Sequence, residues 1–145
     1  MKVNSILSTK HGDVITAAPG DSLADAVATL AKHNIGALVV IDDGEHVVGI
    51  ISERDVVRVL AERADALSLT VETVMTREVV VGLPQDDVMS VAHTMTERRF
   101  RHLPVVEDGR LMGIVSIGDV LKAQRDKYRG EIDTLETQIM ADDTN

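Results

Sequence analysis

Two short motifs pair a serine with an aspartate three residues later, where an apolar stretch gives way to a helical pattern. They are Ser52 with Asp55, in residues 49–57, and Ser116 with Asp119, in residues 113–121. The free N–H groups and partial positive charge of a helix N-terminus suit an anion such as a phosphate. A carboxylate one turn into the helix can accept hydrogen bonds from both hydroxyls of a ribose. These residue types are therefore compatible with nucleotide binding at each motif.

The same spacing also has a purely structural interpretation. Ser-x-x-Asp is close to a capping box, in which each side chain bonds the backbone N–H group of the other residue and opens a helix. Such boxes occur in many unrelated proteins, so a single copy of the motif carries little functional information. A functional role is favoured because both copies lie at matching places of an internal duplication.

The duplication covers most of the chain. Residues 35–44 and 49–58 align with residues 100–109 and 113–122, and nine of the twenty aligned pairs are identical. The offset is 65 up to Gly44 and Gly109 and 64 beyond them, because the second turn is one residue shorter. A change confined to a turn keeps each strand side chain on its own face, as a genuine repeat requires.

Each repeat is expected to run strand–helix–strand–strand–helix after a short lead, because continuous apolar runs alternate with helical periodicity. The first repeat has the lead 3–8, strands 13–17, 37–41 and 47–51, and helices capped at Asp21 or Ser22 and at Ser52. The second has the lead 70–75, strands 78–82, 103–106 and 111–115, and helices capped at Asp86 or Asp87 and at Ser116. This order predicts an α/β (α+β) fold with repeats at 3–66 and 67–126. The repeats pack about a pseudo-two-fold axis that relates two clefts.

Composition limits the classes of function. The net charge of −9 and the pI near 4.9 argue against a nucleic-acid partner and against binding to anionic membranes. The chain has no cysteine, which excludes disulfides and thiolate chemistry. No apolar run reaches the roughly 18 residues of a membrane span, and residues 1–7 lack the apolar core of a signal peptide. We therefore expect a cytoplasmic protein.

The duplicated unit with its Gly-Ile-[Ile/Val]-Ser-x-x-Asp motif resembles a tandem pair of CBS (cystathionine-β-synthase) domains, also called a Bateman module. The resemblance covers about residues 3–125. It implies paired repeats whose clefts bind adenosine-containing ligands, such as AMP, ADP, ATP or S-adenosylmethionine. It also implies that Asp55 and Asp119 bind the ribose and that Ser52 and Ser116 lie near a phosphate.

The resemblance implies further ligand contacts. Aliphatic side chains would flank the adenine, and the expected contacts are Ile15, Leu38, Ile51, Val80, Leu103 and Val115, together with Thr16, Ala37 and Pro104. In relatives that bind phosphates, a basic pair before the second-repeat strand faces them, here Arg101 and His102. Arg99 is a further candidate, because a guanidinium pairs bidentately with phosphate oxygens. The first repeat has only Arg54 to offer, so we expect the second cleft to be the tighter phosphate site.

The basic segment 98–102 also has a structural interpretation. Arg98, Arg99 and Arg101 can form a solvated helix end, where cations interact favourably with the helix dipole. His102 is not expected to bind a metal, because the other histidines show no ligand spacing. No metal and no catalytic cofactor is predicted.

The last helix is predicted to continue beyond the second repeat to about residue 140. Apolar residues follow steps of three, four and seven, a short heptad pattern interrupted by Gly130 and Arg125, at Leu121, Tyr128, Ile132, Leu135 and Ile139. The extension, residues 127–145, can pack back on its own repeat or can contact a second copy. We prefer a homodimer, because an amphipathic tail needs a partner.

Three functions compete. The first is a non-catalytic regulatory module that binds AMP, ADP or ATP, or alternatively S-adenosylmethionine or NAD, and signals to an unknown protein partner. The second is an enzyme, which we disfavour because Asp55 and Asp119 have no evident acid–base partner and no Ser/His/Asp set or Gly-rich phosphate loop is present. The third is a scaffold or dimerisation unit without a nucleotide, in which both motifs only cap helices.

Overall fold

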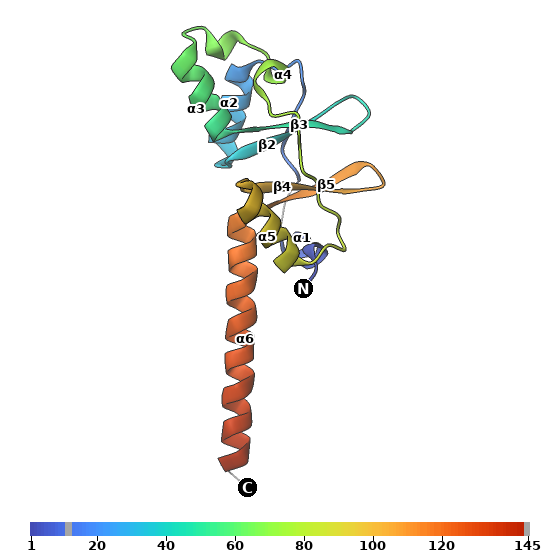
Figure 1. The fold of residues 1–145 in the computed structure, drawn as a ribbon, viewed down its shortest axis with the longest axis vertical. Coiled ribbons are helices and arrows are strands. Elements are labelled where there is room, and N and C mark those ends of the chain that lie inside the picture. The colour runs from blue at the N-terminus through green and yellow to red at the C-terminus, as the bar shows by residue number, and fades with distance from the viewer. Residues whose placement is uncertain (11–12, 144–145) are drawn as a thin grey trace.

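The computed structural model describes residues 1–10 and 13–143, and it consists of two stacked units from which one long helix projects (Figure 1). The first unit contains β1 (Thr16–Ala17), α2 (Leu23–His33), β2 (Ala37–Ile41), β3 (Val47–Ser52) and α3 (Glu53–Glu62). The second contains α5 (Val88–Arg98), β4 (His102–Glu107), β5 (Arg110–Ser116) and α6 (Ile117–Asp143). Lead segments precede the units, namely α1 (Val3–Thr9), the 3₁₀ turn Ala66–Ser68 and α4 (Val71–Val74). The predicted duplicated α/β architecture is confirmed.

The two hairpins share the same register. Strand β3 pairs antiparallel with β2, so that Ser52 lies opposite Ala37, and β5 pairs antiparallel with β4, so that Ser116 lies opposite His102. Strand β1 adds a parallel edge to the first hairpin through Thr16 and Ala17. Each motif serine is therefore the last residue of its strand, at the same end of its sheet, and a helix begins at the next residue.

The strand predicted at 78–82 does not form, and the one predicted at 13–17 is reduced to Thr16–Ala17. Gly82 makes a single parallel bridge, in which its N–H donates to the Pro104 carbonyl at 2.8 Å and its carbonyl accepts from the Val106 N–H at 2.9 Å. The next ladder bond would need an N–H on residue 104, which proline lacks. The matching residue of the first repeat is Val39, which pairs with Thr16. Pro104 therefore explains why the second sheet has two strands.

The caps of α2 and α5 follow their side-chain chemistry. Ser22 accepts a hydrogen bond from the Asp25 N–H, and Asp87, rather than Asp86, accepts one from the Ser90 N–H. Both helices end on a residue in the left-handed conformation, Asn34 with φ 51° and Arg99 with φ 57°. Asparagine adopts this conformation readily, whereas for arginine it is unfavourable.

The two units exchange their lead segments, so that each hydrophobic core contains residues from the lead of the other repeat. Val71 and Met75, in the lead of the second repeat, belong to the core of the first unit, around Leu38 and Ile51. Val3 and Ile6, in the lead of the first repeat, belong to the core of the second unit, around Val115 and other strand residues. Each unit thus completes its core with the segment that leads into the other.

Two equivalent glycines allow the exchanged segments to reach the hairpins. A Cβ atom on Gly49 would overlap the Met75 sulfur and lie 3.0 Å from the Thr76 carbonyl oxygen. A Cβ atom on Gly113 would lie 2.8 Å from a methyl carbon of Leu7. These close approaches explain a glycine in the middle of each strand, where it otherwise weakens a sheet.

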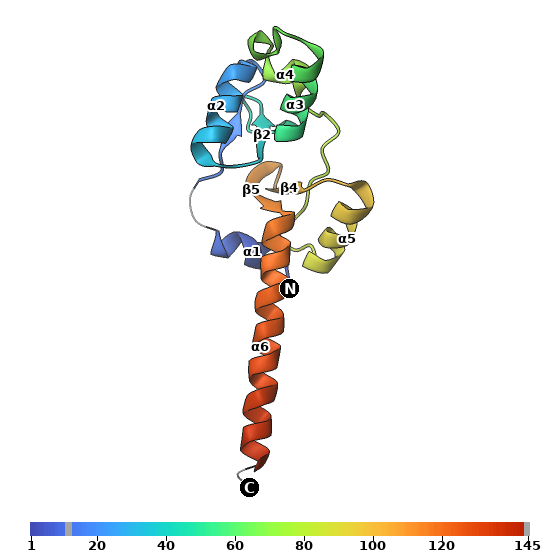
Figure 2. The ribbon, with the colours of Figure 1, turned by 90° about the vertical axis from the view of Figure 1, so that its left-hand side faces the viewer.

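Helix α6 is the longest element, with 27 residues, and it extends past the predicted end near residue 140 to Asp143. Its first turns pack on the second core through Ile117, Val120 and Ala123, and the remainder stands clear of both units (Figure 2). No helix in the described ranges combines the length and hydropathy that a membrane span requires.

We expect Gly49→Ala to lower the free energy of unfolding by roughly 1–3 kcal/mol, because the added methyl group must displace Met75 and the backbone at Thr76. Urea denaturation monitored by circular dichroism measures the loss. Gly20→Ala is the matched control, since a Cβ atom there meets nothing within 4 Å. An equal effect of both substitutions would contradict the close approach at Gly49.

Candidate functional site

Both Ser-x-x-Asp motifs form capping boxes. The Ser52 N–H donates to Asp55 Oδ2 at 2.9 Å, and the Asp55 N–H donates to Ser52 Oγ at 3.3 Å. The Ser116 N–H donates to Asp119 Oδ2 at 2.9 Å, and the Asp119 N–H donates to Ser116 Oγ at 3.1 Å. The structural interpretation of the motifs is therefore correct. It engages only one oxygen of each carboxylate, so a second role is open to the other.

The second oxygen of Asp55 has little to bind within the protein. Asp55 Oδ1 accepts one long hydrogen bond, from Thr76 Oγ1 at 3.4 Å. Within the described chain, no lysine, arginine or histidine nitrogen lies within 4 Å of this carboxylate. Asp55 is partly exposed, so its free oxygen is available to a ligand that donates hydrogen bonds.

Asp119, in contrast, is already paired with a cation. Lys10 Nζ donates to Asp119 Oδ2 at 2.8 Å and to the Ile114 carbonyl oxygen at 2.8 Å. Partial burial raises the pKa of Asp119, but Lys10 and the Ser116 N–H outweigh this and hold the pKa below its usual range. Lys10 thus shares Oδ2 with the capping box and neutralises the carboxylate that was expected to bind a ribose.

A cavity of about 920 Å³ opens beside Asp55, between the two repeats. The first repeat lines it with residues around its motif, and the second contributes the end of α5 and the start of β4. Seven of the predicted ligand contacts meet here: Ser52, Arg54, Asp55, Val80, Arg99, Arg101 and His102.

The basic segment of the second repeat thus shares a cavity with the motif of the first. We expected Arg101 and His102 to make the second cleft the tighter phosphate site, but the structure places them opposite Ser52 and Asp55. The cause is the stacking of the units, which brings the start of β4 against the helix N-terminus of the other repeat. A single sequence does not reveal such a contact across repeats.

The cavity is positive, although the chain as a whole is negative. Its lining contains the five arginines Arg54, Arg58, Arg98, Arg99 and Arg101, and the three carboxylates Glu53, Asp55 and Glu78. Between the described residues, none of these arginines forms an ion pair within 4 Å. An excess of two positive charges in a chain of net charge −9 makes this cavity a suitable place for an anion.

Two residues of the basic segment have unusual environments. Arg99 is itself the left-handed residue that follows the last turn of α5. Such strained backbone conformations cluster at functional sites. Burial lowers the pKa of His102, and the nearby Lys10 and Arg101 lower it further against the opposing effects of Glu53 and Asp119. These effects favour the uncharged imidazole, and a bound anion would raise its pKa.

A family model for the CBS domain matches residues 3–62 and 71–126, once for each repeat. The chain belongs to the CBS domain family.

Solved structures and curated proteins agree with this membership. A CBS-domain containing protein from Agrobacterium tumefaciens is 43% identical with a TM-score of 0.82, over 86% of this chain and 99% of that one. The CBS domain pair of protein MJ0100, solved with 5-methylthioadenosine and S-adenosyl-L-methionine, is 33% identical with a TM-score of 0.78, over 88% of this chain and 98% of that one. The mitochondrial CBS domain-containing protein CBSX3 of Arabidopsis thaliana is 38% identical over 124 residues, which span 82% of this chain and 60% of its own length.

Several predicted contacts of the CBS repeats lie away from the cavity beside Asp55. Ile51 and Val115 are fully buried, one in each core. Side chains alternate along a strand, and it is Ile50 that lines the cavity. The remaining predicted contacts that do not line it are Ile15, Thr16, Ala37, Leu38, Leu103, Pro104, Ser116 and Asp119.

The sequence also missed several lining residues. Strand alternation places Ile50 and Ile51 on opposite faces, but which of them lines the cavity depends on packing. Thr76 reaches the cavity because it bridges to Ile50 from the exchanged lead segment, and nothing in the sequence signals that exchange. The other lining residues that were not predicted are Gly36, Glu53, Arg58, Glu78, Val79, Arg98 and Phe100.

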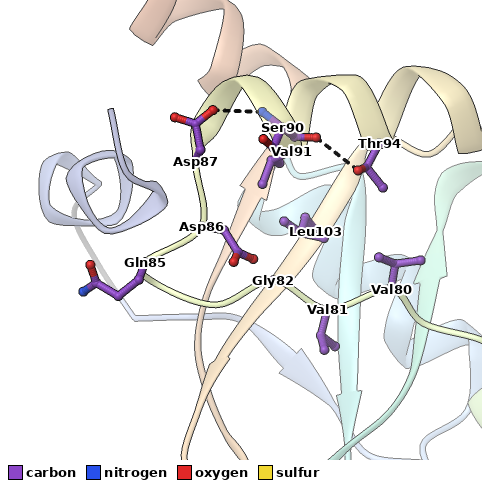
Figure 3. Close-up of a pocket in the computed structure, with 10 residues that line it drawn as sticks. All are labelled: Val80, Val81, Gly82, Gln85, Asp86, Asp87, Ser90, Val91, Thr94 and Leu103. Carbon is purple, nitrogen blue, oxygen red and sulfur yellow. Dashed lines mark hydrogen bonds between the residues drawn. The ribbon is translucent and has the colours of Figure 1, made fainter.

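A second cavity, of about 410 Å³, lies along α5 in the second CBS repeat (Figure 3). Val80 lines both cavities. The polar residues here include Asp86 and Asp87, which are occupied with the N–H groups of Leu83 and Ser90. No basic side chain is among its lining residues, so this cavity does not suit a phosphate.

We expect Asp119→Asn to destabilise the protein at pH 7 by roughly 1 kcal/mol, because a partly exposed ion pair and its hydrogen bonds are lost. Since the pKa of Asp119 is lowered by folding, the ionised carboxylate stabilises the fold above the unfolded-state pKa of about 3.9. That contribution disappears as the pH falls through the lower, folded-state value. The difference between wild type and variant should therefore shrink below about pH 4.

Urea denaturation between pH 7 and pH 3 measures this difference. Asp133→Asn, at an exposed position of α6, is the control and should change stability little at any pH. A pH-independent loss in Asp119→Asn would contradict the ion pair with Lys10.

Proposed function

We propose that this protein is a non-catalytic regulatory CBS pair that binds an adenine nucleotide, AMP, ADP or ATP, in the cavity between its repeats. The observation that carries the proposal is the composition of that cavity. It combines a carboxylate without a cationic partner, Asp55, with an arginine-rich segment on the opposite repeat. A nucleotide has hydroxyls for the first and phosphates for the second.

Each part of the ligand has a matching group. The ribose hydroxyls donate to Asp55 Oδ1, while Oδ2 keeps its role in the capping box. The phosphates accept hydrogen bonds from Arg101, with Arg99 and His102 beside it. Ile50 and Val80 provide apolar surface for the adenine.

We further propose that one site per chain is the principal one. Lys10 shares the capping oxygen of Asp119 and neutralises that carboxylate, which makes it a weaker acceptor for ribose hydroxyls. Asp55 has no such counter-charge within 4 Å in the described chain, which supports the cavity beside it as the site that fills first.

Relatives support an adenosine-containing ligand. The MJ0100 pair, 33% identical to this chain, was solved with 5-methylthioadenosine and S-adenosyl-L-methionine. S-adenosylmethionine is therefore an alternative ligand, and NAD, which also contains adenosine, is a further one. The excess of arginine in the cavity favours a phosphate, because the sulfonium cation of S-adenosylmethionine would be repelled there.

The ligand would change the conformation of the protein and would not be converted chemically. In the proposed function the bound nucleotide changes the arrangement of the two repeats, and a separate protein partner responds to it. The protein acts as a homodimer in the cytoplasm, where adenine nucleotides are available, with neither nucleic acid nor membrane as a partner.

A structural scaffold is the second candidate, because both motifs form complete helix caps. Under that function the cavity binds no nucleotide, and substitution of Asp55 would change stability alone. Ligand binding separates the two candidates.

We expect AMP, ADP or ATP to raise the melting temperature by about 5–10 °C at 100 times its Kd, and GMP to have no such effect. S-adenosylmethionine and NAD complete the panel and test the alternative ligand. Asp55→Asn should weaken binding by about ten- to a hundredfold, because a charged hydrogen bond to the ribose is lost, whereas Asp119→Asn should leave it within about threefold.

Isothermal titration calorimetry on folded variants measures these affinities. The scaffold function is favoured if no ligand in the panel binds. Equal losses in the two variants would overturn the assignment of the site to Asp55.

We expect Arg101→Gln to weaken AMP binding by about tenfold or more while leaving adenosine binding unchanged, because only AMP carries a phosphate. Calorimetry with both ligands gives the comparison. Arg110→Gln, at an exposed arginine outside the cavity, is the matched control. A parallel loss of adenosine and AMP binding would indicate that Arg101 does not contact the phosphate.

A further inference from the structure

The free part of α6 carries an apolar stripe that nothing in the described chain covers. Five side chains form it, each between 52% and 65% exposed: Leu121, Tyr128, Ile132, Leu135 and Ile139. The helix is about 40 Å long and, beyond its first turns, stands away from both repeats (Figures 1 and 2).

The stripe does not face the protein's own core. Val120, which is 1% exposed, marks the side of α6 that packs on the second repeat. Each residue advances about 100° around a helix, so the stripe is centred roughly a quarter-turn from Val120. Its residues occupy the a and d positions of a heptad pattern, with Arg125 and Asp142 at two further positions of the same seam. This geometry fits a second helix lying alongside.

We propose that two copies of this chain pair through α6 as an antiparallel two-helix coiled coil. In the pairing that we infer, Ile132 packs against the partner's Leu135, and Tyr128 packs against the partner's Ile139. By symmetry each contact occurs twice. The pairing covers residues 125–142, about 26 Å of helix, with Leu121 just outside it, and leaves the two pairs of CBS repeats at opposite ends.

Charge decides the direction. In the antiparallel pairing, Arg125 lies opposite the partner's Asp142 within the seam, and Arg129 flanks the partner's Glu136. A parallel pairing in register would instead place Arg125 against the partner's Arg125 and Glu131 against the partner's Glu136. The same residues that interrupt the apolar stripe are therefore complementary in one direction and repulsive in the other.

Gly130 fits this arrangement as well. It lies on the face of α6 opposite the seam, and a Cβ atom there meets nothing within 4 Å. The glycine therefore leaves the packing of the seam intact. The pairing deepens the homodimer of the proposed function, but it uses no residue of the cavity and does not depend on a ligand.

Sedimentation equilibrium of the full chain tests the proposal. We expect a reversible dimer that Glu136→Arg weakens by about tenfold, because two attractive pairs with Arg129 become repulsive. Adding Arg129→Glu to that variant should restore the wild-type affinity. Asp133→Arg makes the same change of charge on the outer face of α6 and should leave the dimer unchanged.

Each other outcome overturns the pairing. A wild-type chain that stays monomeric, or a dimer that is insensitive to Glu136→Arg and to Ile132→Asp, would show that α6 does not mediate association. A dimer that Glu136→Arg strengthens would indicate the parallel direction, because that change removes the contact with Glu131. Circular dichroism checks that the helix is retained. AMP titration of Glu136→Arg reports the cavity separately, so that failure of the dimer and failure of nucleotide binding are distinguished.

Discussion

The exchange of lead segments between the two cores is the constraint on which the rest of the structure depends. Helix α1 completes the core of the second repeat, and α4 completes that of the first. Neither core is whole without chain from the other side, so the repeats cannot drift apart while both stay folded. The exchange also carries Thr76 to Asp55 and Lys10 to Asp119. The different environments of the two motifs therefore originate in the same connection that holds the units together.

The sequence predicted the fold well where the signal is local or repeated. The helix starts near residues 22 and 87, the two hairpins and the continuation of the last helix all follow from residue type and periodicity, although the sequence left Asp21 or Ser22 and Asp86 or Asp87 open as the caps. The strand predicted at 78–82 does not form because Pro104, in the strand that it would pair with, lacks the N–H group for the next hydrogen bond. This could be seen only once the pairing of the strands was known. Ile51 rather than Ile50 was predicted as a ligand contact. Both are apolar, and which of them faces the cavity depends on how the strand packs. Which motif Arg101 and His102 would meet could not be predicted, because it depends on how the repeats stack.

In the proposed function, helix capping and ligand binding use different oxygens of the same aspartate. One oxygen of Asp55 closes the first turn of α3, which fixes the direction of the carboxylate. The other oxygen is left at the edge of a cavity whose opposite wall carries arginines. A preformed carboxylate loses little conformational freedom when a ligand arrives. The capping box would thus orient the carboxylate for the proposed ligand while it starts the helix, so the structural interpretation of the motif leaves room for the functional one.

The contact between Lys10 and Asp119 has a consequence for how such a protein would respond to its ligand. With one favoured site in each chain, occupancy follows a simple hyperbola and changes gradually over a wide range of concentration. A steeper response would require the sites of two chains to be coupled through their association. In the proposed function, Lys10 disfavours the second motif, so a single chain responds gradually to the ligand concentration and has no second site to which the first could be coupled.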